Sequence, residues 1–201
     1  MARMRLLRAN GCGTCLVVVN MSNNTTLGLL LLSCLAAVGC GDSIDVTTMN
    51  PRHLEDGRVY DRKHDFSLVP PPSYASTGPA PHHFMNYLGP GEDGLTVNFH
   101  VNVVGDDGTP IANAAPKSQR VLRWLLQDYS CIEQGLTTID GKDTYVCSGR
   151  FIWEGKNCRN LQYFIRGGNG RIYVLTFASL SSTYHIHLET FRRIAQTARI
   201  G

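Results

Sequence analysis

The chain has 201 residues, of which 43% are hydrophobic and 17% charged, an ordinary globular composition with room for one domain with a core. Three of the 19 lysine and arginine residues, Arg3, Arg5 and Arg8, precede Cys40, so that the remainder equals the 16 acidic residues, all of which follow Cys40. A domain with no net charge lacks the clustered basic face that binds phosphates, which argues against a nucleic-acid-binding protein.

Residues 1–39 have the pattern of a lipoprotein signal peptide. The basic start is followed by the apolar run Leu27–Gly39, which is shorter than the roughly 20 apolar residues needed to span a bilayer. The small residues before Cys40, and Gly41-Asp42 after it, resemble a bacterial lipobox, in which the cysteine becomes the lipidated first residue of the mature protein. We therefore expect lipidation at Cys40 and a membrane-anchored protein of the bacterial cell envelope, facing the periplasm or the exterior.

Two alternatives to this assignment stay open. Leu31-Leu32-Ser33-Cys34 is a competing lipobox, with the leucine that such motifs usually have and that Ala37 replaces before Cys40. The second alternative is that residues 1–39 form an ordinary secretory signal, either cleaved or uncleaved.

Residues 40–61 carry Asp, Thr, Asn, Pro and Gly without a sustained period, which indicates a flexible tether between lipid and domain. We expect the folded domain to span residues 62–201. Its first strand is Phe66–Val69, stopped by three prolines, and its second is His82–Leu88, ended by Gly89-Pro90-Gly91. The strictly alternating stretch Leu95–Val103 predicts a half-buried strand.

The second half of the domain is predicted as a helix, four strands and a final helix. Ser118–Tyr129 has helical spacing of apolar residues, with Ser118 as a candidate cap. The strands Cys131–Ile139 and Thr144–Trp153 are joined by a turn at Asp140-Gly141. Two aromatic-rich runs, Leu161–Ile165 and Ile172–Phe177, flank a glycine-rich turn, which is typical of a hairpin.

The last segment, Thr183–Arg199, again has helical spacing. This element order predicts an α+β fold in which helices pack on an antiparallel sheet.

The order and spacing of these motifs resemble the Mog1/PsbP-like fold, and specifically the bacterial PsbP-related and DcrB-like lipoproteins. The resemblance is carried by short strand and turn motifs, namely Phe66–Pro70, Gly89-Pro90, Leu95–Val103 with Asn98 and Asn102, Ile139-Asp140-Gly141, Leu161–Phe164, Tyr173–Phe177 and Phe191-x-x-Ile194. It covers about residues 64–200. The resemblance implies an α/β/α sandwich and a non-enzymatic role in docking on or assembling a membrane-associated complex, and it supplies no catalytic residues.

Three cysteines follow Cys40, namely Cys131, Cys147 and Cys158, so that a single disulfide would leave one thiol free. The sequence does not decide their pairing. Whichever thiol stays reduced is the best candidate nucleophile, although no recognisable histidine partner accompanies it.

Other candidate sites have simpler explanations. His185-x-His187 would share one face of a strand and could then bind a metal, but on the predicted helix the two side chains diverge. His82-His83 face opposite sides of a strand. The acidic pairs Asp106-Asp107 and Glu92-Asp93 lack calcium-loop spacing and indicate solvated turns. We therefore assign no catalytic, cofactor-binding or metal-binding residue and no cofactor.

Two functional classes follow from the sequence. The first is a lipid-anchored binding or assembly module, attached to membrane lipid through Cys40 and bound to an unidentified protein partner. The second is an exported small-ligand carrier or enzyme that uses a pocket between sheet and helix. A large apolar cavity with convergent polar groups would favour the second class, and an exposed apolar patch the first.

Overall fold

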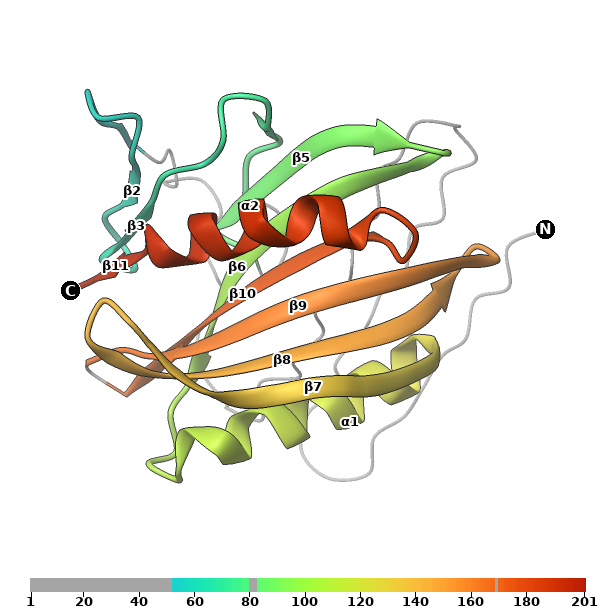
Figure 1. The fold of residues 1–201 in the computed structure, drawn as a ribbon. Helices are drawn as coiled ribbons and strands as arrows, with labels where there is room; N and C mark the ends of the chain where they lie inside the picture. Colours follow the sequence, from blue (N-terminus) through green and yellow to red (C-terminus); the bar gives the residue numbers. More distant parts are fainter. Residues whose placement is uncertain (1–51, 80–82, 169) are drawn as a thin grey trace.

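The computed structural model describes residues 52–79, 83–168 and 170–201. They form two antiparallel sheets and two main helices (Figure 1). The larger sheet has the strand order β4-β5-β6-β10-β9-β8-β7. The smaller has the order β1-β2-β3-β11 and packs at the end of the molecule that carries the C-terminus. The predicted α+β architecture is confirmed.

The middle of the large sheet is formed by β6 (Leu95–Gly105), β10 (Arg171–Leu180) and β9 (Lys156–Arg166). The predicted central hairpin is confirmed: β9 pairs with β10, and Gly167 N donates to Arg171 O at 2.8 Å across the turn. The strand β6 runs two residues further than predicted and is buried on both faces over most of its length, rather than half-buried.

The outer strands of this side are β8 (Lys142–Trp153) and β7 (Gln127–Ile139). They meet at the predicted Asp140-Gly141 turn, where both residues have positive φ, 53° and 69°. β7 begins four residues earlier than expected and includes Tyr129, which the sequence placed in the preceding helix.

On the other side, β5 (Met85–Glu92) pairs with β6 and with β4 (Ala75–Ser76). The predicted strand end at Gly89-Pro90-Gly91 is wrong, because β5 continues through these residues with a shift of register between Leu88 and Gly91. Such a bulge accommodates a proline, which has no N–H to donate. Gly89 is required by packing, since a Cβ there would lie 2.6 Å from the Tyr74 ring.

The two helices cover opposite faces of the large sheet, as a sandwich requires. α1 (Ala114–Leu125) follows the short 3-10 helix η2 (Ile111–Asn113) and begins four residues before the predicted start. Ser118 is therefore buried within the helix and is not its cap. α2 (Tyr184–Gln196) is confirmed in its first three turns, but Arg199 belongs to the strand β11 (Arg199–Ile200).

The face that carries α2, here called the α2 face, holds the main core. Three phenylalanines form its centre: the ring centroids of Phe99 and Phe177 lie 5.4 Å apart, and those of Phe177 and Phe191 5.0 Å apart. The opposite face, here called the α1 face, carries two smaller clusters that include Leu122 and Leu126 of α1 and its C-terminal end. Each helix therefore packs on the part of the sheet where the strands present apolar side chains.

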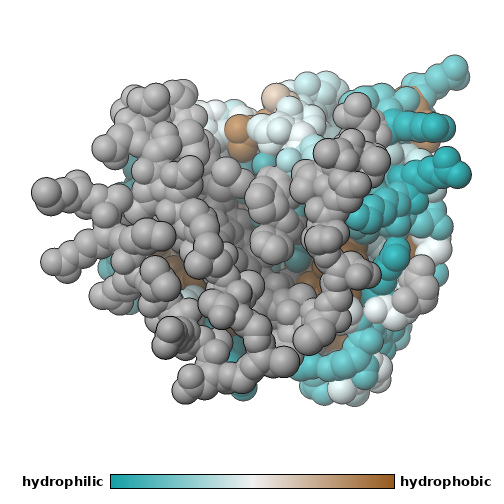
Figure 2. Space-filling view, turned by 180° about the vertical axis from the view of Figure 1, so that it is seen from behind, coloured by the Kyte–Doolittle hydropathy of each residue, from teal (hydrophilic) through white to brown (hydrophobic). Residues whose placement is uncertain are grey.

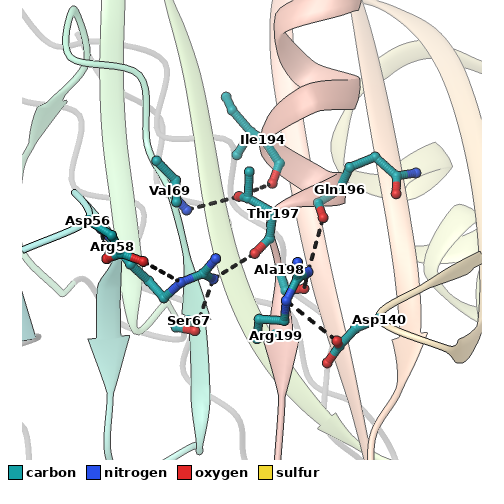
Figure 3. Close-up of polar contacts among 10 residues, drawn as sticks. All are labelled: Asp56, Arg58, Ser67, Val69, Asp140, Ile194, Gln196, Thr197, Ala198 and Arg199. Carbon is teal, nitrogen blue, oxygen red and sulfur yellow. Dashed lines mark hydrogen bonds and ion pairs between the residues drawn. The ribbon is translucent and has the colours of Figure 1, made fainter. Parts of the chain in front are cut away.

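The small sheet ties the N-terminal part of the described chain to the end of α2 (Figure 3). It consists of β1 (Arg52–His53), β2 (Val59–Asp61), β3 (Phe66–Leu68) and β11. Arg58 Nη1 donates to Thr197 O at 2.7 Å, and Val69 N donates to Thr197 Oγ1 at 2.9 Å. Arg199 forms an ion pair with Asp140, 3.6 Å apart.

This arrangement lies across the expected domain boundary at residue 62. Val59 has no exposed surface, Asp61 is buried, and Asp61 Oδ1 accepts a hydrogen bond from His64 N at 2.8 Å. Residues 58–61 therefore pack as part of the fold, whereas the sequence assigned them to the tether. Phe66–Leu68 is a strand as predicted, but it is the third strand of the described chain and belongs to the small sheet.

Candidate functional site

A groove lies on the α2 face between α2 and the strands β7, β8 and β9, with a volume of about 530 Å³. It exists because α2 packs over β9 and β10 and leaves β7 and β8 uncovered on this face (Figure 1). Apolar and aromatic side chains of the sheet line it, namely Val146, Leu161 and Tyr163. Further lining residues come from α2 and β7, among them Tyr184, Leu188, Arg192, Glu133 and Thr137.

One end of the groove carries polar groups that contact one another. Tyr184 Oη and Ser148 Oγ lie 3.4 Å apart, and Arg159 Nη2 donates to Ser148 Oγ at 3.1 Å. The Arg159 guanidinium carbon is 4.1 Å from the centroid of the Tyr184 ring, a cation–π contact.

The two tyrosines of the groove are neutral near pH 7. Burial raises the pKa of Tyr163 to about 12. Burial also raises the pKa of Tyr184, although the Ser148 hydrogen bond and the Arg159 charge act in the opposite direction. Neutral phenols donate and accept hydrogen bonds, so these residues are suited to binding a partner and not to accepting a proton near pH 7.

The groove is bordered by β7, which is the last strand of the large sheet and leaves one backbone edge unpaired among the described residues. Natural edge strands are protected against further pairing by charges, prolines or short length. β7 is 13 residues long, and its part from Gln134 to Ile139 contains neither charge nor proline. Leu136 in this part is 70% exposed. The strand therefore offers hydrogen-bonding groups and an apolar side chain to a partner.

A second cavity of about 460 Å³ lies at the hairpin end of the same edge. Leu136 and Thr138 of β7 line it together with Ile111 and Arg166. Arg166 is already engaged, since its Nε and Nη2 lie 2.7 and 3.1 Å from the two oxygens of Asp106. This cavity extends the exposed edge of β7 and adds no separate reactive group.

The polar row that alternates with the apolar residues of β6 is largely buried on the α1 face. Thr96 is half-buried, whereas Asn98, His100 and Asn102 are at most 3% exposed. His100 lies beside His83, with ring centroids 4.1 Å apart. Burial, and then the neighbouring His83, lower the pKa of His100 well below its ordinary value, so that it stays neutral.

The three cysteines of the domain are free thiols in the structure. Burial raises the pKa of Cys147 to about 12 and that of Cys158 to about 11. Reactive cysteines have a lowered pKa, because the thiolate is the nucleophile. Cys131 is partly exposed, and its Sγ lies 3.7 Å from Gln134 Oε1. Neither buried thiol is therefore activated for attack.

Several of the histidines and acidic residues that the sequence singled out have structural partners. His185 is exposed on α2, and His187 Nε2 contacts Glu92 Oε1, which agrees with the prediction that they diverge on a helix. Asp93 and Asp107 lie within ion-pair distance of Lys156 and Lys117. His82 lies outside the described residues. Within the described residues, no group of three histidine, cysteine or acidic side chains is arranged to hold a metal ion.

Sequence reasoning missed Arg150, Arg159 and Tyr184. The pairing of the two arginines could have been found from the two-residue turn Glu154-Gly155, whose residues have positive φ of 48° and 76°. Counting outward from this turn places Arg150 opposite Arg159. The contact with Tyr184 depends on where α2 crosses the sheet, which a pattern of residues does not determine.

The proposed lipidation sites Cys40 and Cys34 lie outside the described residues. In the part of the chain that the structure describes, no helix is long and apolar enough to cross a membrane.

Comparisons with known proteins rest on structure, since neither a family model nor a curated protein matches the sequence. Cyanobacterial PsbP (CyanoP) from Synechocystis sp. PCC 6803 matches with a TM-score of 0.58 and 12% identity over 81% of this chain and 99% of its own. LpqN of Mycobacterium tuberculosis matches with a TM-score of 0.54 and 12% identity, over 67% and 82% of the two chains.

The Ran-binding protein Mog1p of Saccharomyces cerevisiae matches with a TM-score of 0.53 and 10% identity over 76% of this chain and 96% of its own. At these identities the likeness concerns the fold, which agrees with the order of strands and helices described above. This chain therefore has the Mog1/PsbP-like fold.

Proposed function

We propose that this protein is an exported, lipid-anchored and non-enzymatic docking module that binds a protein partner at the bacterial cell envelope. The observation that carries the proposal is the unpaired edge of β7, which is free of charge and proline from Gln134 to Ile139 and runs beside the groove. An edge of this kind binds an extended segment through backbone hydrogen bonds, while neighbouring pockets accept its side chains.

The similar structures support a binding role by analogy. LpqN is described as involved in cell envelope biogenesis and Mog1p as Ran-binding. A shared fold does not transfer a partner, so the partner of this chain is inferred from its own surface. In the view from behind, hydrophilic residues lie along the right side, and apolar residues are visible in several places (Figure 2). The groove on the α2 face has an apolar lining.

Docking is tested by capturing partners of the full chain from its native membrane after crosslinking. Leu136→Lys places a charge on the free edge and should abolish capture. Trp124→Lys is the matched control, because Trp124 is an exposed apolar residue, 62% accessible, that lies on α1. Equal loss of capture in both variants, or none in either, would contradict docking along β7.

The anchor is tested separately. Cys40→Ser should remove labelling by a fatty-acid probe and release the protein from the membrane fraction. Persistent labelling of that variant, lost in Cys34→Ser, would move the anchor to Cys34. Labelling that survives in both variants would contradict lipid attachment at either cysteine.

A second candidate, a small-ligand carrier, is favoured by the groove volume of about 530 Å³, which falls within the usual range for ligand sites. The groove is bordered by Tyr163, Tyr184 and Arg192, which would orient a ligand. Native mass spectrometry of the purified protein separates the two functions. A bound small molecule that is lost on narrowing the groove by Val146→Trp would support the carrier.

A further inference from the structure

Two arginines face each other directly across β8 and β9 on the α2 face. Arg150 and Arg159 are register partners, and directly opposed residues in an antiparallel pair point to the same side with Cβ atoms about 4.5–5.5 Å apart. Like charges in this position destabilise a sheet. None of the ion pairs among the described residues includes Arg150, Arg159 or Arg192. The positive charge is therefore left without a close counterion.

Arg159 is held in place with hydrogen-bonding capacity unused. Its guanidinium stacks on the Tyr184 ring at 4.1 Å, and one of its five N–H groups bonds to Ser148 Oγ. Its Nε is buried and has no hydrogen-bond partner. A charged group fixed in this way, with a buried donor unsatisfied, is poised for an anion that would offset the cost of burial.

Arg150 extends toward the free edge of the sheet. Its Nε donates to Ser130 Oγ of β7 at 2.9 Å, so that the side chain crosses from β8 to the last strand. Its two terminal nitrogens form no hydrogen bond to the described residues around it. An acidic side chain on a strand added outside β7 would meet this guanidinium first.

The charged side chains around the two arginines leave a net positive charge. Arg192 lines the groove that Ser148 and Tyr184 also line. The facing acids are Glu133, which lines the groove from β7, and Glu189 on α2, which acts on Tyr163. Three arginines thus stand against two glutamates, and neither glutamate is within ion-pair distance of an arginine.

We propose that Arg150 and Arg159 form a carboxylate-binding site that selects an acidic residue of an extended peptide docked along β7. The inference rests on the proposed docking function and names the chemistry of its partner. A peptide fits better than a lipid headgroup or a free anion, because Arg150 contacts Ser130 of the edge strand and Arg159 contacts Ser148 and Tyr184, which line the apolar groove. Guanidinium groups bind carboxylates through paired hydrogen bonds, which adds direction to the charge.

The test uses the full chain and two synthetic peptides followed by NMR. Each probe is a capped eight-residue peptide of alternating threonine and valine, with glutamate in one and glutamine in the other at the same central position. The glutamate peptide should shift the backbone amides of β7 and the Nε–H signals of Arg150 and Arg159. It should bind about tenfold more tightly than the glutamine peptide, the ratio expected for one charged hydrogen-bonded contact.

Arg150→Gln should remove this tenfold preference without lowering the melting temperature, because it also relieves the repulsion between the opposed arginines. Arg159→Lys, which keeps the charge but loses the paired geometry, should reduce the preference. Arg120→Gln is the matched control, since Arg120 is exposed on α1 at the opposite face.

The outcomes separate this inference from the docking function. If both peptides shift β7 and bind equally, docking stands and the carboxylate site is wrong. If neither peptide binds, both are wrong. If inorganic phosphate or anionic vesicles shift the arginine signals while the peptides do not, the arginines serve a free anion or a headgroup, and the proposal is overturned.

Discussion

The α2 face has two halves that differ in what covers them. Under α2, the strands β6 and β10 present large aromatic residues, and Phe99, Phe177 and Phe191 stack at centroid distances near 5 Å. Toward β7 the same face presents smaller residues, such as Gly135, Thr137, Val146 and Ser148, beside an open groove. Both halves consist of antiparallel strands of one sheet, so the size of the side chains marks which half a helix covers.

The ends of α2 explain why the helix does not cover both halves. At its start, Glu92 of β5 contacts His187 Nε2 and the hydroxyl of Thr183. At its end, Arg58 and Val69 bond to Thr197 (Figure 3). Both sets of contacts come from the side of the molecule away from β7. On the β7 side the helix is held at its first turn, where Tyr184 contacts Ser148 and Arg159, and the groove stays open beyond these contacts.

The largest expected effect of a single substitution is in the covered half. Phe177→Ala should lower the free energy of unfolding by about 3–5 kcal/mol, because it empties a fully buried site between three other aromatic rings. Urea denaturation followed by circular dichroism measures this loss. Thr137→Ala in the open half is the control and should change stability by less than about 0.5 kcal/mol. Similar losses in the two variants would remove the distinction between the halves.

Because α2 is attached to the small sheet, removing the residues before 62 should lower the stability of the domain. A chain that begins at residue 62 lacks Val59, which is fully buried, and Arg58, which donates to Thr197 O. Burial of a valine contributes about 1.5–3 kcal/mol and a charged hydrogen bond about 1.5–3 kcal/mol. Compared with a chain that begins at residue 52, thermal unfolding should occur at a clearly lower temperature. Equal melting temperatures of the two chains would mean that residues 52–61 belong to the tether and do not stabilise the fold.

A moderate effect is expected from pH. The pKa of His100 is lowered in the folded chain, whereas an unfolded histidine binds a proton near pH 6.5. The unfolded state thus takes up the proton first, so stability falls as the pH drops below about 6.5. His100→Gln should flatten the curve of stability against pH. An unchanged curve would show that His100 does not cause the loss.

A smaller effect is expected at the start of α2. His187→Ala removes the contact with Glu92 and should cost about 1 kcal/mol. His185, which is exposed on the same helix, provides the control, and His185→Ala should be close to neutral. If hydrogen exchange in α2 is equally fast in both variants, the contact with Glu92 does not help to hold the helix.

The smallest effect on stability belongs to the free edge. Leu136→Ser should change the free energy of unfolding by less than about 0.5 kcal/mol, because the side chain is already 70% exposed. The same change should weaken capture of the partner. Calorimetry of the purified variant tests the first statement, and a large loss of stability would mean that Leu136 supports the fold rather than docking.

Much of the fold could be predicted because its signals are local. Alternation in Leu95–Val103 and the glycine-rich turn after β9 led to correct strands, and the spacing of Ile186, Leu188 and Phe191 led to the last helix. The errors arose where distant contacts prevail over local preference. β5 continues through Pro90 because a bulge and the Tyr74 ring accommodate Gly89-Pro90. β2 forms a strand because it pairs with β1 and with β3, and β3 is held in turn by the distant β11.

The site was harder to predict than the fold. A groove depends on where α2 crosses the sheet, and the contacts that place it, from Arg58 and Glu92, join residues far apart in the sequence. The opposed pair Arg150 and Arg159 could have been found by counting from the Glu154-Gly155 turn. Of the residues that the sequence singled out, His187, Asp93 and Asp107 have partners within the fold, and His185 is exposed.

The bond between Arg58 and Thr197 joins residues 139 positions apart, and it has a consequence for the order of folding. Contacts of such long range form late, since a long loop must close before they contribute. In a chain that emerges amino end first, whether from a ribosome or through a membrane pore, β2 and β3 wait beside an incomplete sheet until Arg199 and Ile200 have followed. The small sheet thus closes only after nearly the whole domain has reached the same compartment.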